Sequence, residues 1–177
     1  MIDPIPFRNR KFLFSEDLKC DIIEVTEGAI SMSSKALFHV TVKGIVAYEG
    51  KLLLLKKVKP SKDNYGYWEL PGGGMEYNES PMEAVKREVL EETGLEVDVE
   101  GAVSTFHVVR KDKEIVGIIF LCYAKNNEVK LSAEHTEYVF VTQEETKDYL
   151  AQGLIDDTFG GKVVCLDGTK GKLYNCE

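Results

Sequence analysis

The alternation of apolar and polar residues is clearest between residues 38 and 57. The runs FHVTVKGIVAY and KLLLLKK are rich in apolar and β-branched residues, and only Glu49 and Gly50 separate them. Such runs predict two strands, and a two-residue connection that ends in glycine predicts a β-hairpin. Further along, VDVEGAVSTFHVV and EIVGIIFLCYA flank the charged turn RKDK, and EYVFVT follows them. These runs predict three more strands.

A helix is predicted to begin just after residue 80. Ser80 fits the N-cap, Pro81 fits the first helical position, and Glu83 completes a capping box with Ser80. Gly94 offers the left-handed residue that commonly ends a helix. The apolar residues expected to face inward at helical spacing are Ala84, Val85 and Val89.

The predicted strands and helices interleave without strict β-α alternation. Thr142 and Glu145 make a second capping box, which predicts a helix over residues 143–151. This order of elements favours the α/β class, with helices sandwiching a mixed β-sheet. The chain of 177 residues is long enough for one domain with a hydrophobic core. Residues 1–35, with the strand-like runs FLF and DIIEV, are expected to form an N-terminal extension (an arm, a lid or extra strands) before a domain over residues 36–177.

The most unusual stretch is REVLEETG, residues 87–94. On a helix, Glu88, Glu91 and Glu92 share one face, where each pair of like charges costs roughly 0.2–0.5 kcal/mol. An acidic face exposed to solvent is the ordinary explanation of such a run. The alternative is a site for Mg²⁺ or Mn²⁺, because these cations take oxygen ligands and commonly bind together with substrate phosphates.

A long loop is predicted directly before this helix. The stretch KPSKDNYGYWELPGGG is rich in Gly, Pro, Asn and Asp, and loops of that size in compact domains are usually functional. Gly72, Gly73 and Gly74 allow backbone N–H groups to approach a ligand closely, and the N-terminus of a helix favours anions. A cation site beside such a loop suits the cleavage of a phosphate ester or anhydride.

The same stretch resembles the signature of a known family. The residues that match the Nudix box, at every position, are Gly73, Glu79, Arg87, Glu88, Val89, Glu91, Glu92, Gly94 and Leu95. The preceding WELPGG is similar to what the family has there, and the strand pattern over residues 38–151 resembles its α/β/α sandwich. The resemblance implies Mg²⁺-dependent hydrolysis of a nucleoside diphosphate that is linked to another moiety.

The resemblance also implies roles for the residues of the box. Glu88, Glu91 and Glu92 would bind the metal, and the last two are also expected to be catalytic. Arg87, the third catalytic candidate of the box, would orient the glutamates through charge-assisted hydrogen bonds. Glu79 would support the site from the start of the helix.

A general base outside the box is expected on the later loop SAEHTEY. Either Glu134 or Glu137 would serve there, with a box glutamate as the remaining option, and we favour Glu134. His135 is expected to be a surface histidine. The residues expected to contact the substrate are Gly72, Gly73, Gly74, Lys56 and Arg110. The aromatic candidates for stacking on a base are Tyr65, Tyr67, Trp68, Phe106 and Phe140.

The absence of sequence features that are typical of particular subfamilies narrows the choice of substrate class. All five prolines precede the end of the box, so the later proline typical of ADP-ribose hydrolases is missing, and Asp112 and Lys113 stand where dinucleoside polyphosphate hydrolases have a tyrosine. The run typical of NADH hydrolases is absent as well. A pyrophosphohydrolase of (deoxy)nucleoside triphosphates is therefore favoured. The alternatives are a nucleoside-diphosphate-sugar hydrolase and a non-catalytic nucleotide-binding regulatory module. An isomerase of similar fold would need a catalytic cysteine, but Cys122 is expected to lie in the core.

The amino-acid composition limits the classes of binding partner that we expect. The net charge of −8 argues against binding to a nucleic acid polymer or a membrane, where a basic surface supplies the affinity. A small anionic nucleotide is still a possible ligand, because bound cations can reverse the local negative charge. The four scattered cysteines, the polar N-terminal stretch and the shortness of every apolar run lead us to expect a cytoplasmic protein. A homodimer is one assembly to which the N-terminal extension could contribute.

Overall fold

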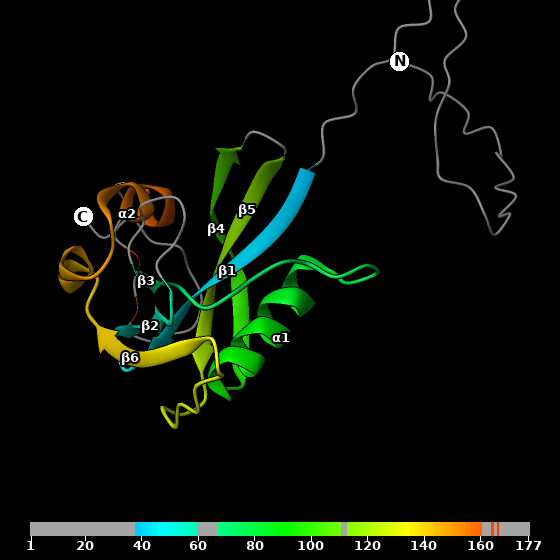
Figure 1. Ribbon diagram of the computed structural model, residues 1–177. Coiled ribbons are helices and arrows are strands. Elements are labelled where there is room, and N and C mark those ends of the chain that lie inside the picture. The colour runs from blue at the N-terminus through cyan, green and yellow to red at the C-terminus, as the bar shows by residue number, and fades with distance from the viewer. Residues whose placement is uncertain (1–37, 60–66, 111–112, 161–163, 165, 167–177) are drawn as a thin grey trace, which may run out of the picture. The chain divides into compact units, whose positions relative to one another are not determined.

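The computed structural model describes residues 38–59, 67–110, 113–160, 164 and 166. Within them the α/β class is confirmed, because helices flank a mixed sheet (Figure 1). The runs FLF and DIIEV, and the expected N-terminal extension as a whole, lie outside the described residues. The boundary at residue 36 and the roles suggested for the extension therefore stay predictions.

The sheet contains the five strands that the sequence predicts between residues 38 and 142. The elements in chain order are β1 (Phe38–Tyr48), β2 (Lys51–Lys57), β3 (Trp68–Glu69), α1 (Pro81–Thr93), β4 (Val97–Val109), β5 (Glu114–Ala124), β6 (His135–Val141), a 3₁₀ helix (Glu144–Asp148) and α2 (Gln152–Phe159). The strand order is β3-β2-β1-β5-β4, and β6 pairs with β2. β1 and β5 run parallel, and the other neighbours run antiparallel.

The hairpin between β1 and β2 has the predicted turn. Glu49 and Gly50 both have positive φ, 48° and 78°, the combination that matches the twist of two flanking strands. The two strands pair only beside this turn, at Ala47 with Leu52 and at Tyr48 with Lys51. Since β1 pairs with β5 along almost its whole length, the first half of β1 keeps an edge that β2 does not occupy. That edge positions the candidate site.

Helix α1 begins and ends as predicted. The Ser80 side chain accepts a hydrogen bond from the Glu83 backbone, the Glu83 carboxylate accepts one from the Ser80 backbone, and Gly94 closes the helix at φ 70°. The buried residues of the helix include Ala84, Val85 and Val89, as expected. The capping box thus fixes where α1 starts, and the three apolar residues decide which face it turns to the sheet.

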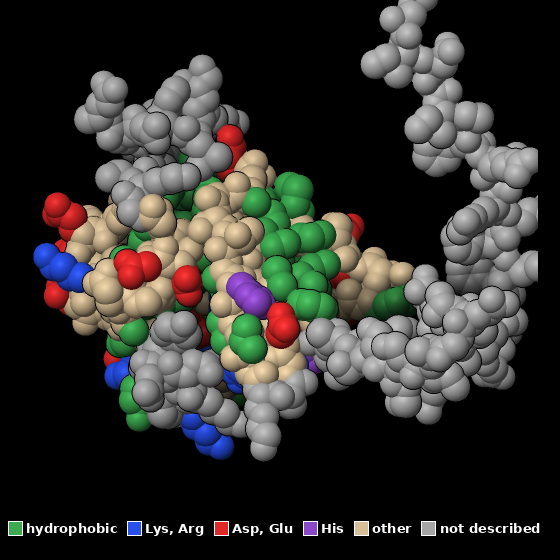
Figure 2. All heavy atoms as spheres, turned by 90° about the horizontal axis from the view of Figure 1, so that it is seen from above, with side chains coloured by type: hydrophobic (Ala, Val, Ile, Leu, Met, Phe, Trp, Pro, Cys, Tyr) green, Lys and Arg blue, Asp and Glu red, His purple; other side chains and the backbone are tan. Residues whose placement is uncertain are grey.

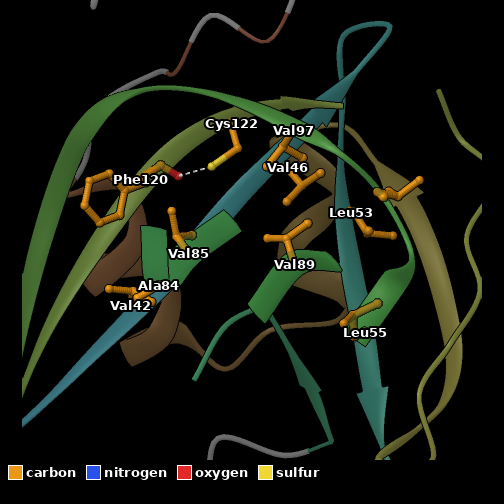
Figure 3. Close-up of a cluster of buried hydrophobic side chains, with 11 residues drawn as sticks. Val42, Val46, Leu53, Leu55, Ala84, Val85, Val89, Val97, Phe120 and Cys122 are labelled. Carbon is orange, nitrogen blue, oxygen red and sulfur yellow. Dashed lines mark hydrogen bonds between the residues drawn. The ribbon is translucent and has the colours of Figure 1, made fainter. Parts of the chain in front are cut away.

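Two hydrophobic layers cover the two faces of the sheet. Alternate residues of β1 divide between them: Val42 and Val46 join the layer under α1, whereas Ile45 and Ala47 join the layer that contains Phe159 of α2. The first layer is drawn in Figure 3, where Val85 and Val89 of α1 point toward the strands.

Cys122 belongs to the first layer, and its thiol donates to the Phe120 carbonyl oxygen at 3.9 Å (Figure 3). Burial raises the pKa of the Cys122 thiol to about 12. Such a thiol stays protonated at neutral pH, so Cys122 is a core residue, as expected, and the isomerase alternative has no thiolate at this position.

The helix predicted over residues 143–151 is wrong in kind and extent. Thr142 and Glu145 do exchange the hydrogen bonds of a capping box, yet they begin only the 3₁₀ helix. The chain then turns at Ala151, which is extended, and α2 follows. Its N-cap has no side-chain hydrogen bond, so the sequence carried no capping signal for a second start.

The described helices are too short and too polar to cross a bilayer. The face of the molecule in Figure 2 shows acidic side chains among hydrophobic ones, with the basic side chains at its margin. Over its described residues, this face carries no continuous basic surface of the kind that binds a phosphate backbone.

Candidate active site

The glycine-rich loop lies against the unoccupied edge of β1. Val42 N–H donates to the Gly73 carbonyl oxygen at 2.9 Å, and Gly44 N–H donates to the Pro71 carbonyl oxygen at 2.8 Å. The loop therefore continues the sheet at the point where β2 has diverged. This pairing holds the loop backbone directly beside α1.

Two of the three glycines are required by close approach. Gly72 has φ 132°, and a Cβ there would lie 2.2 Å from the Val42 carbonyl oxygen. A Cβ at Gly73 would lie 2.6–2.7 Å from the carboxylate atoms of Glu88. A Cβ at Gly74 would meet nothing within 4 Å among the described residues. The missing side chains of Gly72 and Gly73 thus let the loop touch both β1 and α1.

Arg87 gathers the carboxylates around the start of α1. Its Nε and Nη2 donate to the two oxygens of Glu79 at 2.8 and 3.0 Å, and its Nη1 donates to Glu88 at 2.9 Å and to Glu91 at 3.2 Å. Nη2 also donates to the Gly74 carbonyl oxygen. The hydrogen bonds to Glu79 and then Glu88 raise the pKa of Arg87 above its ordinary value. The repulsion expected from the sequence is therefore offset by a cation on the same face.

Glu92 turns away from Arg87 into the protein. It is 8% exposed, and its Oε2 accepts a hydrogen bond from Gly72 N–H at 2.8 Å. Burial raises the pKa of the Glu92 carboxyl, and the charge of Lys43 partly opposes this. The three glutamates thus do not converge on one point in this structure: Glu88 and Glu91 share Arg87, and Glu92 binds the loop.

A partly buried polar cluster surrounds Glu92. We call Lys43, Lys57, Glu69, Glu92 and His135 the Glu69 cluster. Glu69 forms ion pairs with Lys43 and Lys57, each at 2.9 Å, and His135 Nε2 lies 3.3 Å from Glu69 Oε1 and 3.9 Å from Glu92 Oε1. Burial alone would raise the pKa of Glu69, but the two ammonium groups and His135 outweigh it and hold that pKa far below its usual range.

The expectation of a surface histidine at position 135 is wrong. The His135 side chain has no exposed surface. The pairing of β6 with β2 shifts register between Lys56, opposite Glu137, and Lys57, opposite His135. This irregularity turns His135 inward although Glu137, two residues on, is exposed.

A pocket of about 540 Å³ opens beside the loop, on the face of the sheet that α2 covers. Trp68 and Phe106 contribute aromatic surface, and Lys57, Arg110 and Lys113 contribute positive charge. The pocket is of the size that ordinarily holds a small ligand. The predicted contact residues that line it are Gly72, Gly73, Gly74 and Arg110.

Two other predicted residues lie elsewhere. Lys56 pairs with Glu137 at 2.7 Å and sits 5.7 Å above the Trp68 ring, outside the residues that line the pocket. Glu134 is exposed, and its carbonyl oxygen accepts from Val58 N–H. Its carboxylate has no hydrogen bond or ion pair with the described residues, so it is available to a ligand.

Sequence reasoning did not select Lys43, Glu69 or His135. Lys43 is a lone charge within the apolar run of β1, and Glu69 lies inside WELPGG, so two signals were present. The Lys43 ammonium donates to Glu69, to the Leu70 carbonyl oxygen at 3.0 Å and to the Gly72 carbonyl oxygen at 2.6 Å. The charge of Lys43 within a buried strand indicated that an ion-pair partner must lie nearby. The sequence alone does not show that this partner is Glu69.

The acidic groups offer two candidate positions for a divalent cation. Ligand atoms of Glu69, Glu92 and His135 lie within 4.8 Å of one another. Two lysines already neutralise Glu69, however, and a cation there would have to displace them. Glu88 and Glu91 each keep one oxygen free of Arg87, and the Glu88 carboxylate lies against the loop in the space that a Cβ at Gly73 would take. Hard carboxylate oxygens in this setting fit Mg²⁺ or Mn²⁺.

This fold and loop–helix site are those of a Nudix hydrolase. The family model described as the NUDIX domain matches residues 37–157, and the chain belongs to that family. A MutT-like protein of Streptomyces ambofaciens is 35% identical over 121 residues, which cover 68% of this chain and 74% of that protein.

Two further relatives carry different names. An ADP-ribose pyrophosphatase of Methanocaldococcus jannaschii is 35% identical over 104 residues, which cover 57% of this chain and 60% of that protein. The crystal structure of a MutT protein from Methanosarcina mazei is 34% identical, with a TM-score of 0.56 over 64% of this chain and 83% of that one. Family and hydrolase class are thus shared, whereas the names differ in substrate.

Proposed function

We propose that this protein hydrolyses nucleoside triphosphates to nucleoside monophosphates and pyrophosphate, with Mg²⁺ or Mn²⁺ as the required cation. The observation that carries the proposal is the 540 Å³ pocket that opens directly beside Gly72, Gly73 and Gly74. It combines an aromatic wall, positive side chains and the loop that contacts the acidic face of α1. A nucleoside with a short chain of phosphates would fit these features, because its base can contact the aromatic wall and its phosphates can contact the positive side chains and the loop.

Different residues of the pocket would bind the base and the phosphates of the substrate. The Phe106 ring packs over Gly117, where a Cβ would overlap the ring atoms, and it lines the same pocket as Trp68. Aromatic faces of this kind support a base. Arg110 and Lys113 would bind phosphate oxygens, and α2 would close the far side.

The acidic residues would supply the chemistry. Glu88, Glu91 and Glu92 would hold the cation, which when bound lowers the pKa of water and neutralises charge on the phosphate oxygens. Arg87 would hold Glu88 and Glu91 in place through the hydrogen bonds already formed. Glu134, whose carboxylate is exposed, would remove the proton from the attacking water.

One observation favours a second substrate class. A relative with 35% identity is named an ADP-ribose pyrophosphatase, so a nucleoside diphosphate linked to a sugar remains the alternative. Every acidic position of the box is present, which argues against a binding module without catalysis. We further propose a cytoplasmic location, from composition alone.

A substrate panel with product analysis tests the proposal. Nucleoside triphosphates, nucleoside-diphosphate sugars and ADP-ribose should be compared at equal concentration with Mg²⁺, and each reaction repeated with excess chelator. We expect pyrophosphate from triphosphates, the highest kcat/KM for that class, and no turnover with chelator. Turnover that survives chelation contradicts the cation requirement, and preference for a sugar-linked diphosphate contradicts the substrate class.

A further inference from the structure

The Glu69 cluster is more than an ordinary buried salt bridge, because it joins three separate parts of the site. Glu69 lies on β3, Glu92 lies near the end of α1, and His135 begins β6. Lys43 of β1 binds Glu69 and also the Gly72 carbonyl oxygen, while Gly72 N–H binds Glu92. The path from His135 to the glycine loop is therefore continuous.

The charges of the cluster balance. Lys43 and Lys57 carry two positive charges, and Glu69 and Glu92 carry two negative charges. His135 adds a hydrogen-bond donor to this group. Buried charges are stable only when they are paired in this way.

The proton of His135 is placed by its neighbours. Both groups near Nε2 are carboxylates, which only accept hydrogen bonds, so Nε2 carries the hydrogen. Nδ1 is buried and has no hydrogen-bond partner among the described residues. A side chain selected only for packing at this buried position would not need either nitrogen, since an apolar residue would avoid the unpaired Nδ1.

We propose that His135 is a positioning residue for Glu92. Its Nε2–H donates to Glu69, which holds the imidazole 3.9 Å from Glu92 Oε1. At that distance the ring does not hydrogen-bond Glu92, but it limits the rotation of the carboxylate while Gly72 N–H holds the other oxygen. Glu92 is thereby presented to the cation site in one orientation. The inference rests on the proposed function, because only a cation-dependent site needs Glu92 fixed.

Three variants separate the donor from the bulk of the side chain. His135→Gln keeps an N–H donor at about the position of Nε2, His135→Asn has the same amide on a shorter side chain, and His135→Leu removes the donor. Mn²⁺ binding should be measured by electron paramagnetic resonance, together with kcat, KM and the melting temperature in chelator. His107→Leu is the matched control, because His107 also contacts a glutamate, Glu114 at 2.8 Å, but is half exposed and does not line the pocket.

The Leu and Asn variants should bind Mn²⁺ roughly 10–100-fold more weakly and lose kcat in proportion, as do other changes to groups that orient metal ligands. KM should change little, and His135→Gln should restore binding to within a few-fold. The His107→Leu variant should match the parent. In chelator, the melting temperature of His135→Leu should not fall, because no unpaired Nδ1 remains.

Other outcomes overturn the inference. Equal Mn²⁺ affinity in the Gln and Asn variants would show that the donor position is irrelevant, and this comparison holds even if His135→Leu fails to fold. Loss of a whole equivalent of bound Mn²⁺ would make His135 a ligand instead of a positioning residue. A parent protein that neither binds Mn²⁺ nor hydrolyses nucleotides would overturn the proposed function and this inference with it.

Discussion

Arg87 explains how a helix tolerates the acidic run that follows it. A lysine could not replace it, because one ammonium group cannot meet the Glu79 carboxylate with two parallel hydrogen bonds and still reach Glu88 and Glu91. The planar guanidinium does so with three nitrogens. Glu79, outside the acidic run itself, takes part in the same arrangement and so helps to hold Glu88 and Glu91.

Glu134 is the residue on which the proposed mechanism can be tested most directly. Glu134→Gln should lower kcat by about 10²–10⁴-fold with KM little changed, because a general base acts in the transition state more than in binding. Steady-state kinetics on the best substrate of the panel measure both quantities. The exposed position of Glu134 leads us to expect an unchanged melting temperature.

Glu137→Gln is the comparison for this variant. Glu137 is another exposed glutamate of the same segment, and it pairs with Lys56. If Glu137→Gln lost activity and Glu134→Gln kept it, the base would be Glu137. If both kept activity within a few-fold of the parent, the base would lie in the box helix.

At the scale of elements, the site is the contact between the glycine loop and α1. The loop follows β1 through backbone hydrogen bonds, and α1 is fixed on the sheet by Val85 and Val89. These contacts involve neither Glu88 nor Glu91. The loop and helix therefore form a scaffold that can carry charged groups at their junction.

Adjacent glycines provide a test of this junction. In Gly73→Ala the new methyl group would displace the Glu88 carboxylate, so Mn²⁺ affinity and kcat should fall by about tenfold or more. In Gly74→Ala the methyl group meets open space, and both quantities should stay near those of the parent. Equal losses in the two variants would show that loop flexibility matters and that the Glu88 contact does not.

Acid should weaken the start of α1. The hydroxyl and backbone N–H of Ser80 donate to Glu83 and lower its pKa. A carboxyl group whose pKa is lower in the folded protein than in the unfolded chain stabilises the fold at any pH above its unfolded-state pKa. This stabilisation is lost as the pH falls through the folded-state pKa. Glu83→Gln should therefore melt below the parent at pH 7, and the difference should shrink below about pH 4. Melting curves from pH 7 to pH 3 measure it, and a constant difference would exclude the linkage.

At the scale of the whole molecule, we expect the positions of the pocket and of the acidic residues to decide which phosphoanhydride bond is cleaved. The pocket lies on one side of the glycine loop, and Arg87 with its glutamates lies on the helix side. A substrate that fills the pocket would therefore bring an internal phosphorus, not the terminal one, past the loop. The sequence has no second phosphate-binding loop of the form G-x-x-x-x-G-K-[ST].

Hydrolysis in ¹⁸O-labelled water tests this geometry. We expect one labelled oxygen in the nucleoside monophosphate or in the pyrophosphate, in one product alone, as mass spectrometry would show. Orthophosphate as the sole phosphate product of a triphosphate would mean that the terminal phosphorus is attacked. In that case the substrate would have to bind in the opposite direction.

The features that the sequence predicted well are those decided by nearby residues. The turn at Glu49 and Gly50, the capping box of α1 and its inward face depend on residues within a few positions of each other. The acidic positions of the box were recognised by spacing. Family, fold class and hydrolase activity followed from them and are confirmed.

The features that the sequence did not predict depend on distant partners. His135 is buried because β6 pairs irregularly with β2, whose residues lie about eighty positions earlier. The start of α2 has no capping side chain, and its residues Leu154, Ile155 and Phe159 pack against the core. The metal-binding, base and substrate roles assigned to individual residues stay predictions.

The pairing of the glycine loop with β1 has a thermodynamic consequence. A flexible loop loses backbone entropy when a ligand orders it, at about 1–2 kcal/mol per residue, and this loss is subtracted from the affinity. Here the hydrogen bonds from Val42 and Gly44 fix Gly73 and Pro71 through contacts within the protein itself. Because that ordering is complete before any nucleotide arrives, contact energy with the substrate remains available to distinguish the transition state from the ground state.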